Sequence, residues 1–140
     1  MQKTNIQIYD RAIDLSSLYS LVRADNCGAI NQFVGTVRNI TKDKKVVKLF
    51  FEAYEPMALK ELQKIAEHCI DQWSIGCIAI HHRLGELSIG EIAVAILVAS
   101  PHRDAGFKAC QYAIDQLKVT VPIWKKEYFE DGDIWVAAHP

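Results

Sequence analysis

The segment SPHRDAGFKACQYAIDQLKVTVPIWKKE, residues 100–127, follows an apolar run, EIAVAILVA, at residues 91–99. The length and β-branched content of this run predict a buried strand rather than a helix. Ser100 fits an N-cap and Pro101 fits the first helical position, where a missing N–H costs nothing, so we expect a helix to begin at Pro101. Pro122 ends that helix, and the residues after it alternate in polarity. The segment therefore predicts a strand, a tight turn, a long helix and a short strand.

The predicted helix carries His102 and Arg103 in its first turn. Free backbone N–H groups and the positive end of the helix dipole lie at the same place, where cationic side chains are electrostatically unfavourable. Such a combination is typical of an anion site, most naturally one for phosphate. Position alone supports equally well a solvated first turn that binds no ligand.

The body of the helix is amphipathic, because Phe107, Cys110, Ile114 and Leu117 recur at helical spacing. Lys118 lies near the end of the helix. A cation there would ordinarily do no more than interact favourably with the helix dipole.

The strand expected after the helix separates its charged residues onto two faces. Alternation places Lys125 with Ile123 and Glu127, and it places Lys126 with Trp124 on the opposite face. A lysine on such a strand would ordinarily be exposed, and Lys125 can pair with Glu127 on its own face.

The composition is that of an ordinary globular domain, and we expect one domain over residues 1–140. The net charge of −1 does not suggest a nucleic-acid or membrane partner. The longest apolar run, of about nine residues, is too short to span a bilayer. The N-terminus also lacks the apolar core of a signal peptide.

Cysteine and histidine spacing argues against a metal site. Cys69, Cys77 and Cys110 lie in apolar patterns, so we expect buried thiols rather than disulfides or metal ligands, and a reduced, cytoplasmic protein. His81 and His82 are neighbours on an expected strand and point to opposite faces, so they cannot chelate one metal ion.

The remaining elements interleave strands, helices and turns. Polar residues 39–45 predict a mobile loop. The combination favours an α+β layer structure with a mostly antiparallel or mixed sheet. The other expected elements are strands at 5–9, 29–37, 46–54, 75–82 and 134–136, a helix capped by Asp14, a helix opened by Glu55-Pro56, and a turn or short hairpin at 85–90.

Three motifs resemble the large, catalytic subunit of molybdopterin synthase. They are FVGTVRN at 33–39, EAYEPMA at 52–58 and HRDAGFKACQYAIDQLKVTVPIWKKE at 102–127. The three occur in the right order, and the resemblance extends over roughly residues 5–137. It implies an α+β fold of the α/β-hammerhead type with a small extra β subdomain.

The resemblance also implies an activity and a partner. The family is a sulfurtransferase in molybdenum cofactor biosynthesis, and it converts cyclic pyranopterin monophosphate into molybdopterin by installing two sulfurs as a dithiolene. The sulfur arrives as a thiocarboxylate on the C-terminal glycine of a small ubiquitin-like subunit, so no cysteine nucleophile and no cofactor are needed. A homodimer of the large subunit forms a heterotetramer with two small subunits.

Residue by residue, the resemblance implies two catalytic lysines, Lys118 and Lys125. A lysine crowded by cations has a lowered pKa and can exchange protons, whereas a charged lysine can neutralise an anionic transition state. The sequence leaves both roles open. The substrate-binding residues implied are Thr36, Val37, Arg38, His102, Arg103, Lys126 and Glu127.

Two other classes of function stay open from the residues themselves. The chain could be a binding module for a phosphorylated small molecule, or an adaptor whose basic groove only holds a partner's C-terminal tail. Arg38 at a strand end would ordinarily be solvated, although its planar guanidinium suits bidentate phosphate binding.

The length of the predicted helix suggests a shared site. Arg103 and Lys118 are fifteen positions apart, which at 1.5 Å per residue separates their Cα atoms by roughly 22 Å. One compact pterin phosphate cannot easily span that distance. We therefore predict that two copies of the chain share each site, unless the helix is broken or only one end is functional.

Overall fold

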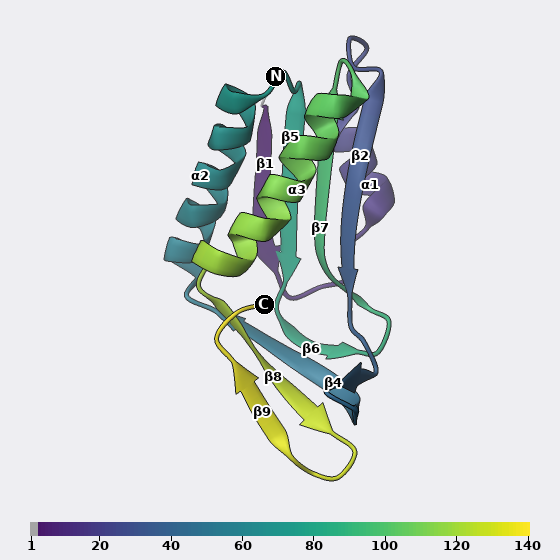
Figure 1. Ribbon diagram of the computed structural model, residues 1–140, viewed down its shortest axis with the longest axis vertical. Coiled ribbons are helices and arrows are strands. Elements are labelled where there is room, and N and C mark those ends of the chain that lie inside the picture. Colours follow the sequence, from purple (N-terminus) through teal and green to yellow (C-terminus); the bar gives the residue numbers. More distant parts are fainter. Residues whose placement is uncertain (1–2) are drawn as a thin grey trace.

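The computed structural model describes residues 3–140, which form three helices and nine strands (Figure 1). Within these residues, no helix combines the length and apolar character that crossing a bilayer requires. In chain order the elements are β1 (Thr4–Tyr9), α1 (Leu15–Val22), β2 (Ala29–Thr36), β3 (Ile40–Thr41), β4 (Lys44–Ala53), α2 (Glu55–Gln72), β5 (Cys77–Arg83), β6 (Gly85–Ser88), β7 (Ile92–Ser100), α3 (Arg103–Thr120), β8 (Ile123–Phe129) and β9 (Ile134–Ala137).

The first sheet has the strand order β1-β5-β7-β2. The β1–β5 pair is parallel, and the other two pairs are antiparallel. Helices α2 and α3 pack together over one face, and the short helix α1 covers part of the other face (Figure 1). The predicted mixed sheet is confirmed. Its strand β7, apolar except for Ser100, is an inner strand and is covered on both faces.

The second sheet has the order β3-β4-β8-β9, and β6 also pairs with β4. Its strands join the helical layer at two points, because β4 leads into α2 and β8 follows α3. Figure 1 shows this sheet beyond the C-terminal end of α3. The arrangement confirms the expected α+β fold with a small additional β subdomain.

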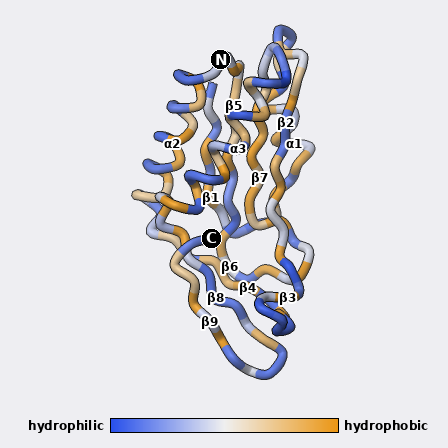
Figure 2. The backbone as a smooth tube through the Cα atoms, in the orientation of Figure 1, coloured by the Kyte–Doolittle hydropathy of each residue, from blue (hydrophilic) through white to orange (hydrophobic). Residues whose placement is uncertain are grey.

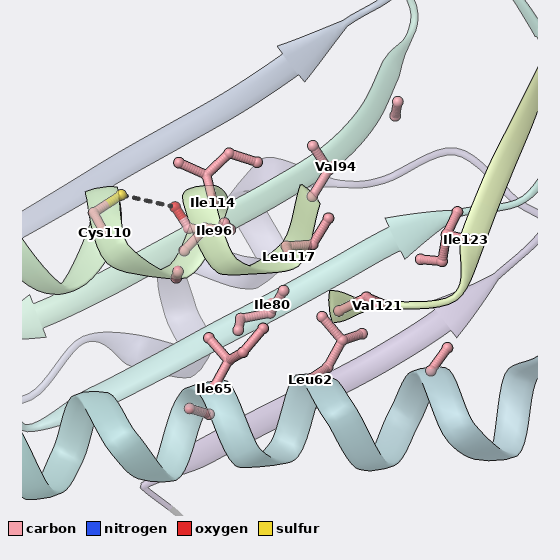
Figure 3. Close-up of a cluster of buried hydrophobic side chains, with 14 of the residues drawn as sticks. Leu62, Ile65, Ile80, Val94, Ile96, Cys110, Ile114, Leu117, Val121 and Ile123 are labelled. Atoms are coloured by element: carbon pink, nitrogen blue, oxygen red, sulfur yellow. Dashed lines mark hydrogen bonds between the residues drawn. The ribbon is translucent and has the colours of Figure 1, made fainter. Parts of the chain in front are cut away.

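The main core lies between the first sheet and the α2–α3 layer. Leu62 and Ile65 of α2 and Leu117 of α3 meet Ile80 of β5 and Ile96 of β7, and all five are at most 5% exposed (Figure 3). Replacing one such side chain by alanine typically costs about 2–5 kcal/mol. In Figure 2 the apolar colouring runs along β7 but alternates with polar colouring along α2, as expected for a buried strand and an amphipathic helix.

Two expectations about side chains are also confirmed. Cys69, Cys77 and Cys110 are buried thiols, and Cys27 is a partly buried thiol. His81 and His82 point to opposite faces of the first sheet. The His81 ring forms a hydrogen bond with Tyr9, whereas the His82 ring contacts the ring of Phe51 in the second sheet.

The start of α3 differs from the prediction. The helix begins at Arg103 rather than Pro101, and His102 is the N-cap residue with extended backbone angles. Ser100 stays in β7, where it pairs with Ala29, and its hydroxyl donates to the His102 carbonyl at 2.6 Å. Sheet pairing therefore holds Ser100 in the strand and delays the helix by two residues.

The expectation of a mobile loop at residues 39–45 is wrong. Strands β3 and β4 form a hairpin there, and its two turn residues, Lys42 and Asp43, have φ values of 49° and 66°. Two positive φ angles are typical of a type I′ turn, which matches the twist of the flanking strands. Lys44 also forms ion pairs with Asp131 and Asp133, so a distant turn holds the hairpin in place.

Candidate active site

A small cavity of about 90 Å³ lies where the two sheets meet beside the C-terminal half of α3. Its walls are largely apolar, and its polar side chains are those of Thr36, His82, Lys118 and Lys125. The other lining residues are Phe33, Gly35, Leu49, Phe51, Ala93, Val94, Ile114, Leu117 and Pro140. A narrow apolar cavity with two lysines suits a small anionic group or the extended end of a chain.

Lys118 lies at the last turn of α3. Its ammonium donates to a main-chain oxygen of Pro140, another lining residue, at 3.1 Å. Partial burial lowers the pKa of Lys118, and the positive charges of Lys125 and Arg38 lower it further. Lys118 is therefore easier to deprotonate than an ordinary lysine, while a nearby anion would favour its charged form.

Lys125 reaches the cavity from β8 and is held there by Glu127. The Lys125 ammonium lies 3.4 Å from the Glu127 carboxylate, which is buried and 3.5 Å from the Thr41 hydroxyl. Glu127 thus orients Lys125 from the same face of the strand. Lys126 lies on the opposite face, where it pairs with Glu52 at 3.2 Å, and it does not line the cavity.

The FVGTVRN motif places three successive residues in three different environments. Thr36 ends β2 and lines the cavity. The Val37 side chain is 3% exposed and packs in the core, so only its backbone could meet a ligand. Arg38 is exposed, and its charge acts on Lys118.

His102 and Arg103 lie at the other end of α3, and both are exposed. Neither lines the cavity that contains Lys118. The helix between them is continuous over 18 residues, from Arg103 to Thr120. A single chain therefore does not bring the two ends of α3 to one compact ligand, and these two residues stay a prediction.

Sequence reasoning missed several cavity residues, among them His82 and Phe51. The two rings contact each other edge to face, with centroids 5.1 Å apart. Alternation along β5 indicates only that His82 faces away from His81. The place of His82 in the cavity wall depends on how the two sheets meet. Within residues 3–140, no group of three His, Cys, Asp or Glu side chains could hold a metal ion.

The fold and the cavity define a class of protein, namely an α+β protein with two lysines in a narrow cavity that has apolar walls. Residues 8–120 match the family model described as MoaE protein. The chain belongs to the MoaE family, the large-subunit family that its sequence motifs resemble.

Two curated relatives have the same name. The chain is 45% identical over 130 residues to the "Molybdopterin synthase catalytic subunit" of Bacillus subtilis, a match that covers 93% of this chain and 83% of the relative. It is also 45% identical over 123 residues to the human protein of that name, covering 88% of this chain and 65% of the relative.

Solved structures agree with the fold. Molybdopterin synthase from Staphylococcus aureus superimposes with a TM-score of 0.90 at 38% identity, covering 99% of both chains. A chain from the complex of subunits 1 and 2 of molybdopterin-converting factor from Helicobacter pylori superimposes with a TM-score of 0.79 at 25% identity. That match covers 96% of this chain and 93% of the other.

Proposed function

We propose that this protein is the catalytic subunit of a molybdopterin synthase. It transfers sulfur from the C-terminal thiocarboxylate of a small ubiquitin-like subunit to cyclic pyranopterin monophosphate, which becomes the dithiolene of molybdopterin. The observation that carries the proposal is the pair of lysines, Lys118 and Lys125, in one apolar-walled cavity of a chain that belongs to the MoaE family.

The bonds that form and break in the reaction define the catalytic groups that the cavity must supply. The thiocarboxylate sulfur attacks a substrate carbon, and the carbon–oxygen bond at that carbon breaks as the carbon–sulfur bond of a thioester forms. The displaced oxygen stays on the phosphate or takes up protons and leaves as water. A second water molecule then attacks the acyl carbon. The acyl carbon–sulfur bond breaks, so the sulfur stays on the pterin and the small subunit leaves as a carboxylate. Two such rounds install two sulfurs, and each round needs proton transfer and stabilisation of an oxyanion.

The lysines supply both requirements. Lys118, with its lowered pKa, can exchange a proton, and Lys125, held by Glu127, provides a fixed positive charge. The hydrogen bond from Lys118 to the Pro140 main-chain oxygen supports this role, because an oxygen from an extended chain segment fits beside the ammonium. An extended C-terminal tail of the small subunit would present its carbonyl oxygen in the same way.

The assembly we propose is a heterotetramer built on a homodimer of this chain. Each site takes Thr36, Arg38, Lys118 and Lys125 from one copy. The substrate phosphate is held by His102 and Arg103 from the other copy, where the start of α3 offers free N–H groups. The relative from Helicobacter pylori, solved as a complex of two subunits, supports a small-subunit partner.

We place the protein in the cytoplasm, and its buried thiols suit a reducing compartment. Mass spectrometry of the pterin after mixing with thiocarboxylated partner tests the function, and the expected product carries two added sulfurs. An unchanged pterin mass would overturn the enzyme proposal. Titration of the precursor without partner would then separate a pterin-binding module from an adaptor that holds only the partner's tail.

A further inference from the structure

His82 is a buried polar residue in the wall of the lysine cavity. It is 1% exposed, and it lines the cavity together with Lys118 and Lys125. Its ring packs edge to face on Phe51 at an interplanar angle of 70°. A polar side chain so deeply buried needs hydrogen-bond partners, so the use of each ring nitrogen can be worked out.

The backbone fixes the tautomer of the His82 ring. Nδ1 lies 2.9 Å from the carbonyl oxygen of Arg83. A carbonyl only accepts hydrogen bonds, so Nδ1 must carry the proton. In the neutral ring the distal nitrogen, Nε2, is therefore an acceptor with a free lone pair.

The ring stays neutral near pH 7. Burial lowers the pKa of His82 to about 4, against a raising effect of the Arg83 carbonyl, and the charge of Lys118 lowers it further. The charge state of His82 also matters for Lys118, because a charged imidazole in the same cavity would repel the ammonium. A neutral imidazole instead offers it an acceptor.

Lys118 has donors to spare for such an acceptor. An ammonium has three N–H groups, and the contact with the Pro140 main-chain oxygen uses one of them. A long lysine side chain is also flexible, and it needs a second contact to direct its nitrogen during a reaction.

We propose that His82 is a positioning residue for Lys118 in the sulfur-transfer reaction, with Nε2 accepting an N–H of the amine and directing it toward the substrate. This inference rests on the proposed function and adds to it a residue that acts through Lys118. When the amine loses its proton, the same hydrogen bond holds one N–H and leaves the nitrogen lone pair turned to the cavity.

A matched pair of uncharged variants tests the role. In His82→Gln the amide oxygen can reach the position of Nε2, whereas in His82→Asn the shorter amide reaches only that of Nδ1. We expect His82→Gln to keep kcat within about threefold and His82→Asn to lower it about tenfold or more, with KM little changed, as for other residues that orient a reactive group. Equal kcat values for the two variants would overturn the proposal.

Dependence on Lys118 is the second arm of the test. In a Lys118→Ala background, His82→Asn should cause no further loss, because the two residues act as one unit. A further tenfold loss there would show that His82 acts independently of Lys118 and would also overturn the proposal. Wild-type protein that adds no sulfur would instead defeat the proposed function itself.

Nitrogen NMR keeps the inference testable even if the variants unfold. Histidine labelled with ¹⁵N in the wild-type protein, with the pterin precursor bound, should show a protonated Nδ1 and an unprotonated, hydrogen-bonded Nε2 at His82. Lys118→Met should move the Nε2 resonance to the position of a free lone pair. A protonated Nε2 in the wild-type protein, or no movement in Lys118→Met, would exclude the proposed contact.

Discussion

The two ends of α3 carry similar charges in very different surroundings. At the C-terminal end, Lys118 meets a second lysine in a cavity with apolar walls, and its pKa is lowered by burial and by neighbouring cations. At the N-terminal end, His102 and Arg103 are exposed. One end is a formed site within a single chain, whereas the other presents charge outward.

This contrast supports the proposal that two copies of the chain share each site. A continuous helix of 18 residues keeps the two ends apart, and a pterin phosphate could engage both only if a second copy supplied one of them. Because the side chains of His102 and Arg103 are exposed, they are accessible to a ligand bound by a neighbouring subunit.

The largest expected effect is at the cavity end. Lys118→Ala should lower turnover by about a hundredfold or more, because loss of a key transition-state charge typically costs that much. Its free energy of unfolding should change by only about 0.5 kcal/mol, as for other exposed helix positions. Steady-state assays and chemical denaturation measure the two quantities.

Lys108→Ala is the matched control for that variant. Lys108 lies on the same helix, exposed and paired with Asp104 at 3.0 Å, and it does not line the cavity. Its loss should leave turnover unchanged. Turnover of Lys118→Ala within about twofold of wild type would remove Lys118 from the catalytic group.

Subunit mixing tests the link between the two ends. Arg103→Ala and Lys118→Ala homodimers should each be nearly inactive, and exchange of subunits should restore roughly a quarter of wild-type activity. Half of the dimers are then mixed, and each mixed dimer holds one intact site and one doubly damaged site. Mixed dimers as inactive as their parents, with exchanged wild-type chains still active, would leave each site within one chain.

A smaller effect is expected at Arg38, which adds positive charge beside the cavity. Arg38→Lys keeps that charge but loses the planar fork that binds phosphate through two bonds. We expect precursor affinity to fall by about tenfold, a loss of about 1.4 kcal/mol. Calorimetric affinities decide the point, and equal values for the two proteins would reduce Arg38 to a general source of positive field.

The smallest effect is a shift in the titration of Lys118. Removal of a nearby positive charge favours the protonated form, so Lys125→Met should raise the pKa of Lys118. The pH dependence of Lys118 acylation, followed by peptide mass spectrometry, should move to higher pH. Lys126→Met is the control, since Lys126 lies on the other face of β8 and pairs with Glu52. Identical acylation curves for Lys125→Met and wild type would exclude the coupling.

Local patterns were sufficient to predict most of the fold. The apolar run of β7 and the helical spacing of α3 need no distant information. The start of α3 was two residues off because Ser100 pairs with Ala29, a contact between distant segments. The hairpin before β4 was missed for a similar reason: its turn, Lys42-Asp43, lacks the glycine or asparagine that usually marks a type I′ turn.

The site was less predictable than the fold. Motif resemblance pointed to Lys118 and Lys125, and the structure brings both into one cavity. No local pattern places His82 and Phe51 beside them, because those two residues belong to different sheets and meet only where the sheets join. The cavity walls are thus a product of tertiary packing, whereas the charged groups are visible in the sequence.

The buried cysteines have a consequence for chemical selectivity. Burial raises the pKa of Cys69 to about 12 and that of Cys110 to about 11, and it also raises that of Cys77. The thiolate rather than the thiol is the nucleophile, so these three side chains stay inert near neutral pH. Cys110 lies one helical turn from Ile114, a residue of the cavity wall. A reactive thiolate there would compete for the activated acyl group. Because these sulfurs stay protonated, the pterin remains the acceptor of the sulfur and water remains the acceptor of the acyl group.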